Sequence, residues 1–98
     1  MRQKPVMYKI TPYTKAQARR LKVIVKPSTR KGKKLDVYDR KGNYLTSVGA
    51  RGYLDYPSYL KLYGKAVADQ RRRLYKIRHR GDRKIKYSAG YFADQLLW

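Results

Sequence analysis

The chain has 98 residues, of which 26 are Lys or Arg and six are acidic, so its formal net charge is +20 at pH 7. It has no cysteine, which excludes a disulfide framework and thiolate metal sites, and no apolar run approaches the ~20 residues of a membrane span. Such a charge favours a polyanionic partner: nucleic acid first, with acidic protein and anionic membrane surfaces as the other candidates. Because 42% of the residues are apolar or aromatic, we expect a folded domain rather than a simple basic tail.

The first twenty residues have no sustained hydrophobic period. They contain Pro5 and Pro12 together with scattered aromatic and apolar residues. This pattern predicts an extended arm over residues 1–20, which is ordered only where something docks it. A short helical turn over 14–20, capped by Thr14, is the alternative for the end of the arm.

Three short segments that follow the arm are predicted to be strands. They are rich in β-branched residues or alternate between apolar and polar positions, and Gly42 suits the tight turn before the last of them. Together they predict a three-stranded antiparallel sheet that needs a helix on one face. The expected strands are 21–26, 35–39 and 44–48.

A long helical region is predicted over residues 56–80. Asp55 is expected to cap its start, Pro57 falls in the first turn, and Gly64 is expected to divide a short helix from a longer one. Apolar residues recur at helical spacing, which predicts one face that packs on the sheet. This stripe comprises Leu60, Tyr63, Val67, Leu74 and Ile77.

The last segment predicts a short C-terminal helix. Ser88 is placed to cap it, and Phe92 and Leu96 would share one face of it. We expect Trp98 to be docked on the domain rather than frayed.

Residues 71–80, RRRLYKIRHR, form the densest basic stretch and contain no acid. Basic residues four apart on a helix repel each other by a few tenths of a kcal/mol per pair, which a bound anion would relieve. We therefore predict a polyanion-binding face here, with an ordinary solvated helix face as the alternative. The candidate binding residues are Arg71, Arg72, Arg73, Lys76, Arg78 and Arg80.

A second basic cluster lies in the predicted loop KPSTRKGKK, residues 26–34. Gly32 would let the backbone approach a phosphate closely, although the spacing is not that of a Walker motif. A flexible basic loop is the alternative, and the sequence leaves open whether the two clusters share one face. The candidate binding residues are Arg30, Lys31, Lys33 and Lys34.

Tyrosine is crowded into residues 53–63, where four of the eleven Tyr residues occur. Tyr beside basic residues can stack on unpaired bases or anchor a protein interface. We favour core or interface positions over base stacking, because no known single-strand-binding sequence pattern accompanies them.

The sequence favours a protein without catalytic activity, cofactor or metal. His79 is the only histidine, and its basic neighbours predict a structural or phosphate-contacting role. A metal site would need clustered His, Cys or carboxylates. A metal-dependent nuclease built from dispersed Asp residues is the enzymatic alternative.

Five features together resemble a family of short basic proteins encoded by large double-stranded DNA viruses of algae and protists. They are KPSTRKGKK (26–34), a glycine hairpin, DY (55–56), RRRLYKIRH (71–79) and LLW (96–98), and the likeness covers roughly residues 22–98. The resemblance implies a viral setting and a small virion- or genome-associated protein. It implies no catalytic residues.

These observations predict one small α+β domain over residues 21–98. We expect a three-stranded antiparallel sheet packed against a basic helix, a short C-terminal helix, and an extended N-terminal basic arm over residues 1–20. The expected function is that of a virion-associated structural protein that binds nucleic acid, with viral DNA as the expected ligand, mainly through the phosphate backbone and with low sequence specificity.

Two other functions fit the same sequence. The first is a minor capsid or cement protein whose arm and basic face bind neighbouring, acidic capsid proteins. The second is a ribosomal or chromatin-like protein. For a viral protein, the expected location is the virion, and the host nucleus or cytoplasm during assembly.

Overall fold

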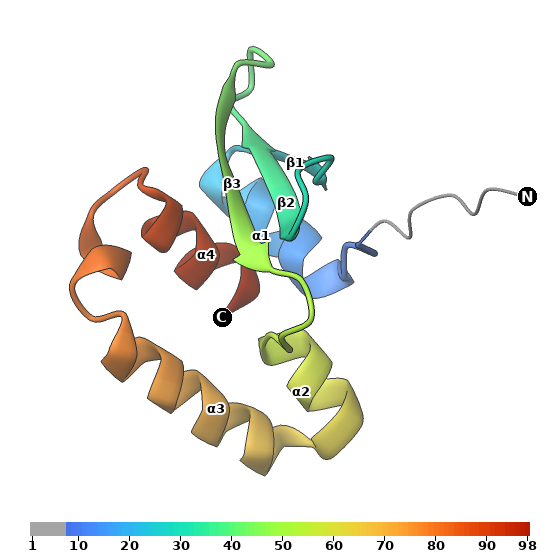
Figure 1. The fold of residues 1–98 in the computed structure, drawn as a ribbon, viewed down its shortest axis with the longest axis vertical. Coiled ribbons are helices and arrows are strands. Elements are labelled where there is room, and N and C mark those ends of the chain that lie inside the picture. Colours follow the sequence, from blue (N-terminus) through green and yellow to red (C-terminus); the bar gives the residue numbers. More distant parts are fainter. Residues whose placement is uncertain (1–7) are drawn as a thin grey trace, which may run out of the picture.

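In the computed structural model of the protein, which describes residues 8–98, the chain forms an α+β fold with a three-stranded sheet and four α-helices (Figure 1). The antiparallel sheet and the C-terminal helix confirm the predicted fold class. No helix within the described residues is long and apolar enough to cross a membrane. In chain order the elements are α1 (Pro12–Leu21), β1 (Ile24–Pro27), β2 (Lys33–Tyr38), β3 (Tyr44–Ala50), α2 (Tyr56–Tyr63), α3 (Lys65–Arg78), a 3-10 helix (Asp82–Lys84) and α4 (Ala89–Leu97).

The sheet has the strand order β1-β2-β3, with antiparallel pairs throughout. Val25 lies opposite Val37, and Leu35 lies opposite Val48, so that apolar residues of all three strands meet on one face. The β2–β3 turn places Gly42 at φ +89°, a conformation that suits glycine, as its position in the sequence predicted.

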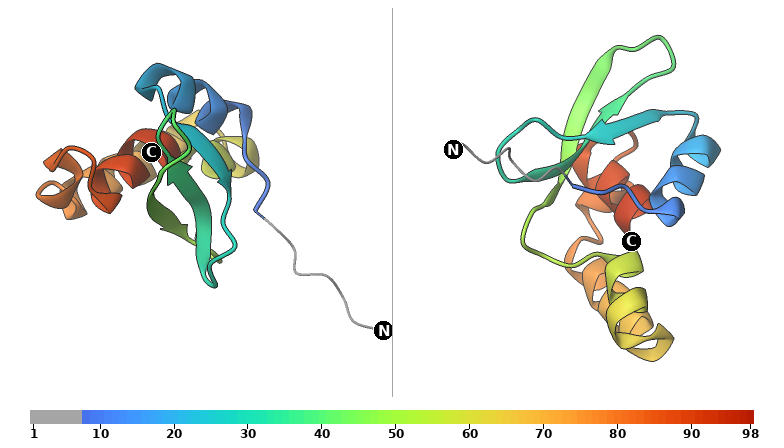
Figure 2. Two further views of the ribbon diagram at one scale, coloured as in Figure 1. Left: turned by 90° about the horizontal axis from the view of Figure 1, so that it is seen from above. Right: turned by 90° about the vertical axis from the view of Figure 1, so that its right-hand side faces the viewer.

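Helices α1 and α4 lie next to each other on the apolar face of the sheet (Figures 1 and 2). The core that they form with the strands therefore does not include α3, the basic helix that we expected to cover the sheet. Helix α4, which is apolar on its inner side, contributes the most residues to this core. The buried core residues are Ala18, Leu35, Val37, Val48, Phe92, Leu96 and Leu97.

Part of the expected arm is folded into this core. Residues 12–20 belong to α1, and Thr11, rather than Thr14, caps the helix by accepting a hydrogen bond from the backbone N–H of Thr14. The Thr14 side chain is buried, and its hydroxyl donates to the main-chain oxygen of Leu96 at 2.8 Å. The prediction of an extended arm is therefore wrong for residues 12–20, and residues 1–7 lie outside the described part of the chain.

The helical region divides at Gly64 as predicted, with Gly64 at φ +88° between α2 and α3. Asp55 caps α2, and Ser88 caps α4, also as predicted. The apolar stripe predicted over residues 56–80 does not form one buried face, because the helix is interrupted at Gly64, between the residues of the stripe. Leu74 and Ile77 are 43% and 54% exposed and are not core residues.

The residues of α3 that face the rest of the domain are not those of the predicted apolar stripe. Ala68 and Tyr75 are buried, and Arg72 and His79 are partly buried, at spacings of four, three and four residues. This row carries polar side chains whose apolar and planar parts pack inward.

Candidate nucleic-acid interface

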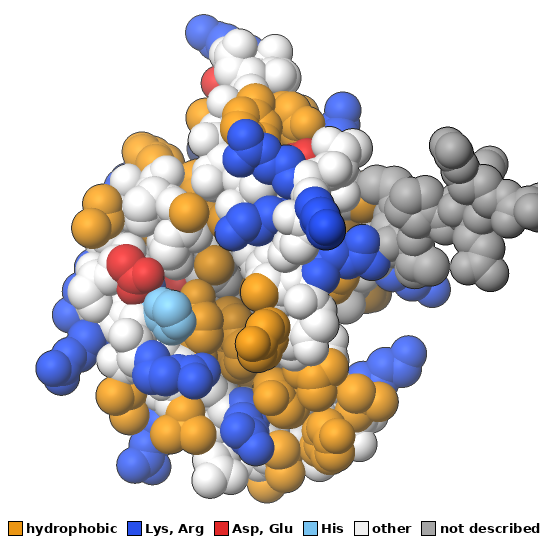
Figure 3. Space-filling view, in the orientation of Figure 1, with side chains coloured by type: hydrophobic (Ala, Val, Ile, Leu, Met, Phe, Trp, Pro, Cys, Tyr) orange, Lys and Arg blue, Asp and Glu red, His pale blue; other side chains and the backbone are white. Residues whose placement is uncertain are grey.

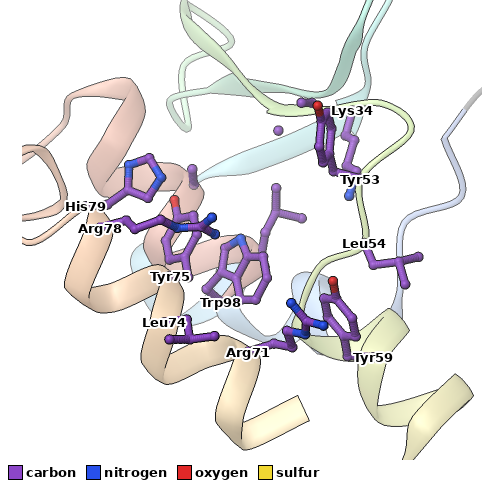
Figure 4. Close-up of a pocket in the computed structure, with 14 residues that line it drawn as sticks. Lys34, Tyr53, Leu54, Tyr59, Arg71, Leu74, Tyr75, Arg78, His79 and Trp98 are labelled. Atoms are coloured by element: carbon purple, nitrogen blue, oxygen red, sulfur yellow. The ribbon is translucent and has the colours of Figure 1, made fainter. Parts of the chain in front are cut away.

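A groove of about 750 Å³ runs between α3 and the chain segment that leads from β3 to α2. Arg71, Tyr75 and Arg78 of α3 line one side, while Lys34 and Tyr53 line the other. Figure 3 shows Lys and Arg side chains on both sides of a hydrophobic hollow, and Figure 4 shows the residues around it. The groove therefore combines a cationic rim with an apolar, aromatic interior.

Trp98 lies in the middle of the groove and belongs to a column of stacked rings (Figure 4). Its ring stacks on that of Tyr75 with a centroid distance of 4.5 Å and an interplanar angle of 8°. His79 stacks on Tyr75 at 4.4 Å, and Tyr59 lies 6.1 Å from Trp98 at a tilt. Burial, followed by the negative charges of Asp94 and Asp82, raises the pKa of Tyr75 to about 12. Tyr75 therefore stays neutral at physiological pH.

Four predicted binding residues, three on α3 and one in the turn that follows it, are exposed and form no ion pair within residues 8–98: Arg71, Arg73, Arg78 and Arg80. Arg71 and Arg78 are seven residues apart and border the groove. Arg73 and Arg80, also seven apart, border a more open hollow between α3 and the 3-10 helix. A spacing of seven residues corresponds to about 10 Å along a helix axis, so Arg71 and Arg78 form an elongated cationic edge along α3.

Arg72, in contrast, is engaged within the fold. Its guanidinium lies 3.4 Å from the ring centroid of Tyr56, and its Nε donates to the main-chain oxygen of Trp98 at 2.8 Å. A further bond, of 3.3 Å, reaches the hydroxyl of Tyr13. Arg72 thus joins α1, α2 and the C-terminal residue to α3, and two of its guanidinium nitrogens already donate within the fold.

Two predicted lysines are also used internally. Lys76 forms an ion pair of 2.7 Å with the buried carboxylate of Asp94, which attaches α3 to α4. Lys34 forms a buried ion pair of 3.0 Å with Asp55, which attaches β2 to the start of α2. Of the ten predicted residues, seven are therefore exposed cations. The other three, Arg72, Lys76 and Lys34, form contacts within the fold that hold the groove together.

Asp55 has a second role besides capping α2. Tyr8 donates its hydroxyl hydrogen to the Asp55 carboxylate at 2.7 Å, and the hydroxyl of Ser58 donates at 2.6 Å. Burial alone would raise the pKa of Asp55, but the hydrogen bonds from Ser58 and Tyr8 and the charge of Lys34 hold it below its ordinary value. Asp55 is thus ionised at neutral pH and fixes the wall of the groove that faces α3.

Lys34 is the member of the loop cluster that lies in this wall. Arg30, Lys31 and Lys33 are exposed. The N–H of Arg51, just after β3, donates to the carbonyl of Gly32 at 2.9 Å, so the loop is attached to the segment that carries Tyr53. Gly32 has φ +81° and open space around it. Of the two basic clusters, the groove therefore brings together Lys34 on one side and Arg71 and Arg78 on the other, while Arg30, Lys31 and Lys33 are not among the residues that line it.

The tyrosines of residues 53–63 occupy different environments. Tyr56 is buried, as a core position predicts, and its hydroxyl donates to Asp69 at 2.8 Å. Tyr59 is partly buried, but Tyr53 is 75% exposed within the groove lining. The aromatic interior of the groove was not predicted from the sequence. Trp98 and Tyr75, which stack in it, are 23 residues apart, and the sequence indicated only that Trp98 is docked on the domain.

His79 makes a 3.2 Å contact through Nδ1 with the carboxylate of Asp82, in addition to its stacking on Tyr75. Within residues 8–98 no group of three or more metal-ligating side chains is close enough to hold a metal ion. The chemistry that the described surface presents is thus cationic and aromatic. Comparisons of the chain with protein-family models, curated proteins and solved structures give no match.

Proposed function

We propose that this protein is a non-enzymatic nucleic-acid-binding protein that holds the phosphate backbone with little dependence on base sequence. The observation that carries the proposal is the concentration of exposed arginines on α3 and just after it, which form no ion pair within residues 8–98, together with the exposed cations of the β1–β2 loop. Cations gathered in this way repel each other, and binding of phosphates with release of their counterions relieves that repulsion.

The setting that we propose is a virus particle. It rests on the resemblance of residues 22–98 to basic proteins of large double-stranded DNA viruses, and it makes viral DNA the natural ligand. Phosphate contacts would then serve to package or line the genome, a task that needs affinity for the backbone and no recognition of base sequence.

A second candidate function, a minor capsid or cement protein, is supported by a different observation. Exposed apolar side chains gather on α2, where Leu62 and Tyr63 are each 61% exposed and Leu60 is also exposed. Such a surface suits contact with another protein. In this role the cations of α3 would bind acidic groups of a neighbouring capsid protein.

A salt titration of binding to a random-sequence DNA duplex separates the two candidates. The test variant replaces four exposed cations by Ala, and a control variant removes the same charge from exposed residues of α1 and the β2–β3 turn. The test variant is Arg71/Arg73/Arg78/Arg80→Ala, and the control is Lys15/Arg19/Arg40/Lys41→Ala.

Under the nucleic-acid proposal, the log–log salt slope of the test variant is shallower than that of wild type by about 3 units, and the control changes it by less than about 1. If both variants change binding equally, the binding reflects net charge alone and α3 is not the interface. Weak binding of wild type at physiological salt would favour the capsid role.

A further inference from the structure

We propose that the groove beside α3 holds an unpaired base of single-stranded nucleic acid, while Arg71 and Arg78 contact phosphates that flank this base. The inference rests on the proposed function and deepens it, because it names the form of nucleic acid that the protein prefers. It also assigns separate roles to the two parts of the site: the cations provide affinity, and the groove provides selectivity.

The lining of the groove has the chemistry that an unpaired nucleotide requires. Among the described residues that line it, no side chain is acidic, and the charge of Lys34 is neutralised by Asp55. The cations on the rim that form no ion pair within residues 8–98 are Arg71, whose guanidinium lies 5.5 Å from the centroid of the Tyr59 ring, and Arg78. Aromatic rings from three parts of the chain lie inside. Every base has a flat face that can pack on such rings, whatever its sequence. These rings are Tyr53, Tyr59, Tyr75 and Trp98.

The groove also has suitable size and order. Its volume of about 750 Å³ lies within the ~300–1,000 Å³ that is usual for ligand pockets, so a base fits with room for part of its sugar. The stacked column of His79, Tyr75 and Trp98 holds the interior in place before any ligand binds. An acidic peptide would use the two arginines but would leave the aromatic interior without a partner.

Single strands are favoured over a duplex for a physical reason. Bases of a duplex are paired and stacked, and a base must be unstacked and flipped out before it can enter a groove in a protein. A duplex would therefore contact the exposed arginines alone, whereas a single strand can contact the arginines and fill the groove.

Tyr53 is the residue that tests this inference with the least disturbance of the fold. It lines the groove, yet it is 75% exposed, so its ring contributes little to the packed core. Figure 4 shows it on the wall opposite α3. Tyr87 is 65% exposed and lies outside the groove lining, which makes it a matched control.

The experiment compares a dT 12-mer with an abasic 12-mer, which has the same number of phosphates and no bases, at one salt concentration. Wild type is expected to bind the dT 12-mer at least about fivefold more tightly than the abasic strand. Tyr53→Leu is expected to remove most of this preference, whereas Tyr53→Phe, which keeps the ring, and Tyr87→Leu retain it. Trp98 is the only tryptophan, so its fluorescence reports on the groove directly: the dT 12-mer quenches it and the abasic strand does not.

The outcomes separate this inference from the proposed function. Tight, salt-sensitive binding of both strands with equal affinity would overturn the groove inference and leave phosphate binding intact. A preference for dT that survives Tyr53→Leu would also overturn it, because the base would then lie elsewhere. Absence of binding to both strands would overturn both proposals, and tighter binding of an acidic peptide would assign the groove to a protein ligand.

Discussion

Lys34 Nζ lies 3.0 Å from the carboxylate of Asp55, and the two side chains are 7% and 1% exposed. Lys34 belongs to β2, and Asp55 caps α2, so this buried ion pair connects the sheet to the start of α2. The pair is compensated by hydrogen bonds to Asp55 from Tyr8 and Ser58. Buried charges need such partners, because each loses its hydration.

We predict that Asp55→Ala lowers the free energy of unfolding by about 3–5 kcal/mol, since it leaves Lys34 buried without its partner and removes the cap of α2. Urea denaturation measures the change. The control is Lys65→Ala, which breaks the exposed ion pair with Asp69 and is expected to leave stability almost unchanged. Equal effects of the two substitutions would contradict the structural role of the buried pair.

The same carboxylate predicts how stability depends on pH. The pKa of Asp55 is lower in the folded state than its ordinary value of 3.8, so its ionised form favours folding. This contribution is present in full above the ordinary value and is lost as the pH falls through the lowered, folded-state pKa. In denaturation curves recorded from about pH 7 to pH 2, the stability difference between wild type and Asp55→Asn should therefore narrow at the acidic end. A difference that stays constant over this range would show that the charge of Asp55 is not involved.

A conservative change at Arg72 is predicted to be costly. Lysine keeps the charge but cannot reproduce the guanidinium contact with the Tyr56 ring together with the hydrogen bonds to Trp98 and Tyr13. Arg72→Lys should lower the free energy of unfolding by about 1–2 kcal/mol, measured by thermal or urea denaturation.

The neighbouring substitution Arg73→Lys is the control, because Arg73 is exposed and has no such contacts with residues 8–98. It should leave stability unchanged. Both variants keep the net charge, so both should bind duplex DNA as wild type does as long as they are folded. A loss of DNA affinity in folded Arg72→Lys, with no loss of stability, would make Arg72 a ligand-binding residue instead.

Gly49 is predicted to be the glycine least tolerant of substitution in the groove wall. It has φ +82°, and an added Cβ would lie 2.7 Å from Leu97 Cδ1 in the core and 3.1 Å from the Lys34 side chain. Gly52 has a similar φ of +90° but open space around it. Gly52→Ala should cost about 1 kcal/mol of backbone strain, and Gly49→Ala should cost at least about 2 kcal/mol more because of the collision with the core. Comparable melting temperatures for the two variants would contradict this packing of α4 against β3.

The local elements were largely predictable because local chemistry determines them. The strand segments, the turn at Gly42, the caps Asp55 and Ser88, and the break at Gly64 each follow from residues close together in the sequence. The packing partner of the sheet was not predictable in the same way. Either α3 or α4 could have covered the sheet. Helix α4 does so because its inner side carries Phe92, Leu96 and Leu97, whereas the inner side of α3 carries Tyr75 and Arg72.

The candidate site was predicted only in part, for a similar reason. Charge density identified α3 and the loop before β2, but it could not tell exposed cations from those that hold the fold together. Lys76 and Arg72 look equivalent to Arg73 and Arg80 in the sequence, yet their partners Asp94 and Trp98 lie 18 and 26 residues further along the chain, in α4 and at its end. The aromatic groove also depends on a contact between residues far apart in the sequence, the stacking of Trp98 on Tyr75, and no short stretch of sequence predicts it.

The most direct test of the account is an NMR titration of the ¹⁵N-labelled protein with an abasic 12-mer, observed through the side-chain Nε–Hε signals of arginine. We predict that the signals of Arg71, Arg73, Arg78 and Arg80 shift as phosphate is bound, and that the signal of Arg72, whose Nε already donates to Trp98, does not. If those four signals stay in place while signals of Arg19 or Arg40 move, the exposed arginines on and just after α3 are not the phosphate-binding surface and the central claim is contradicted.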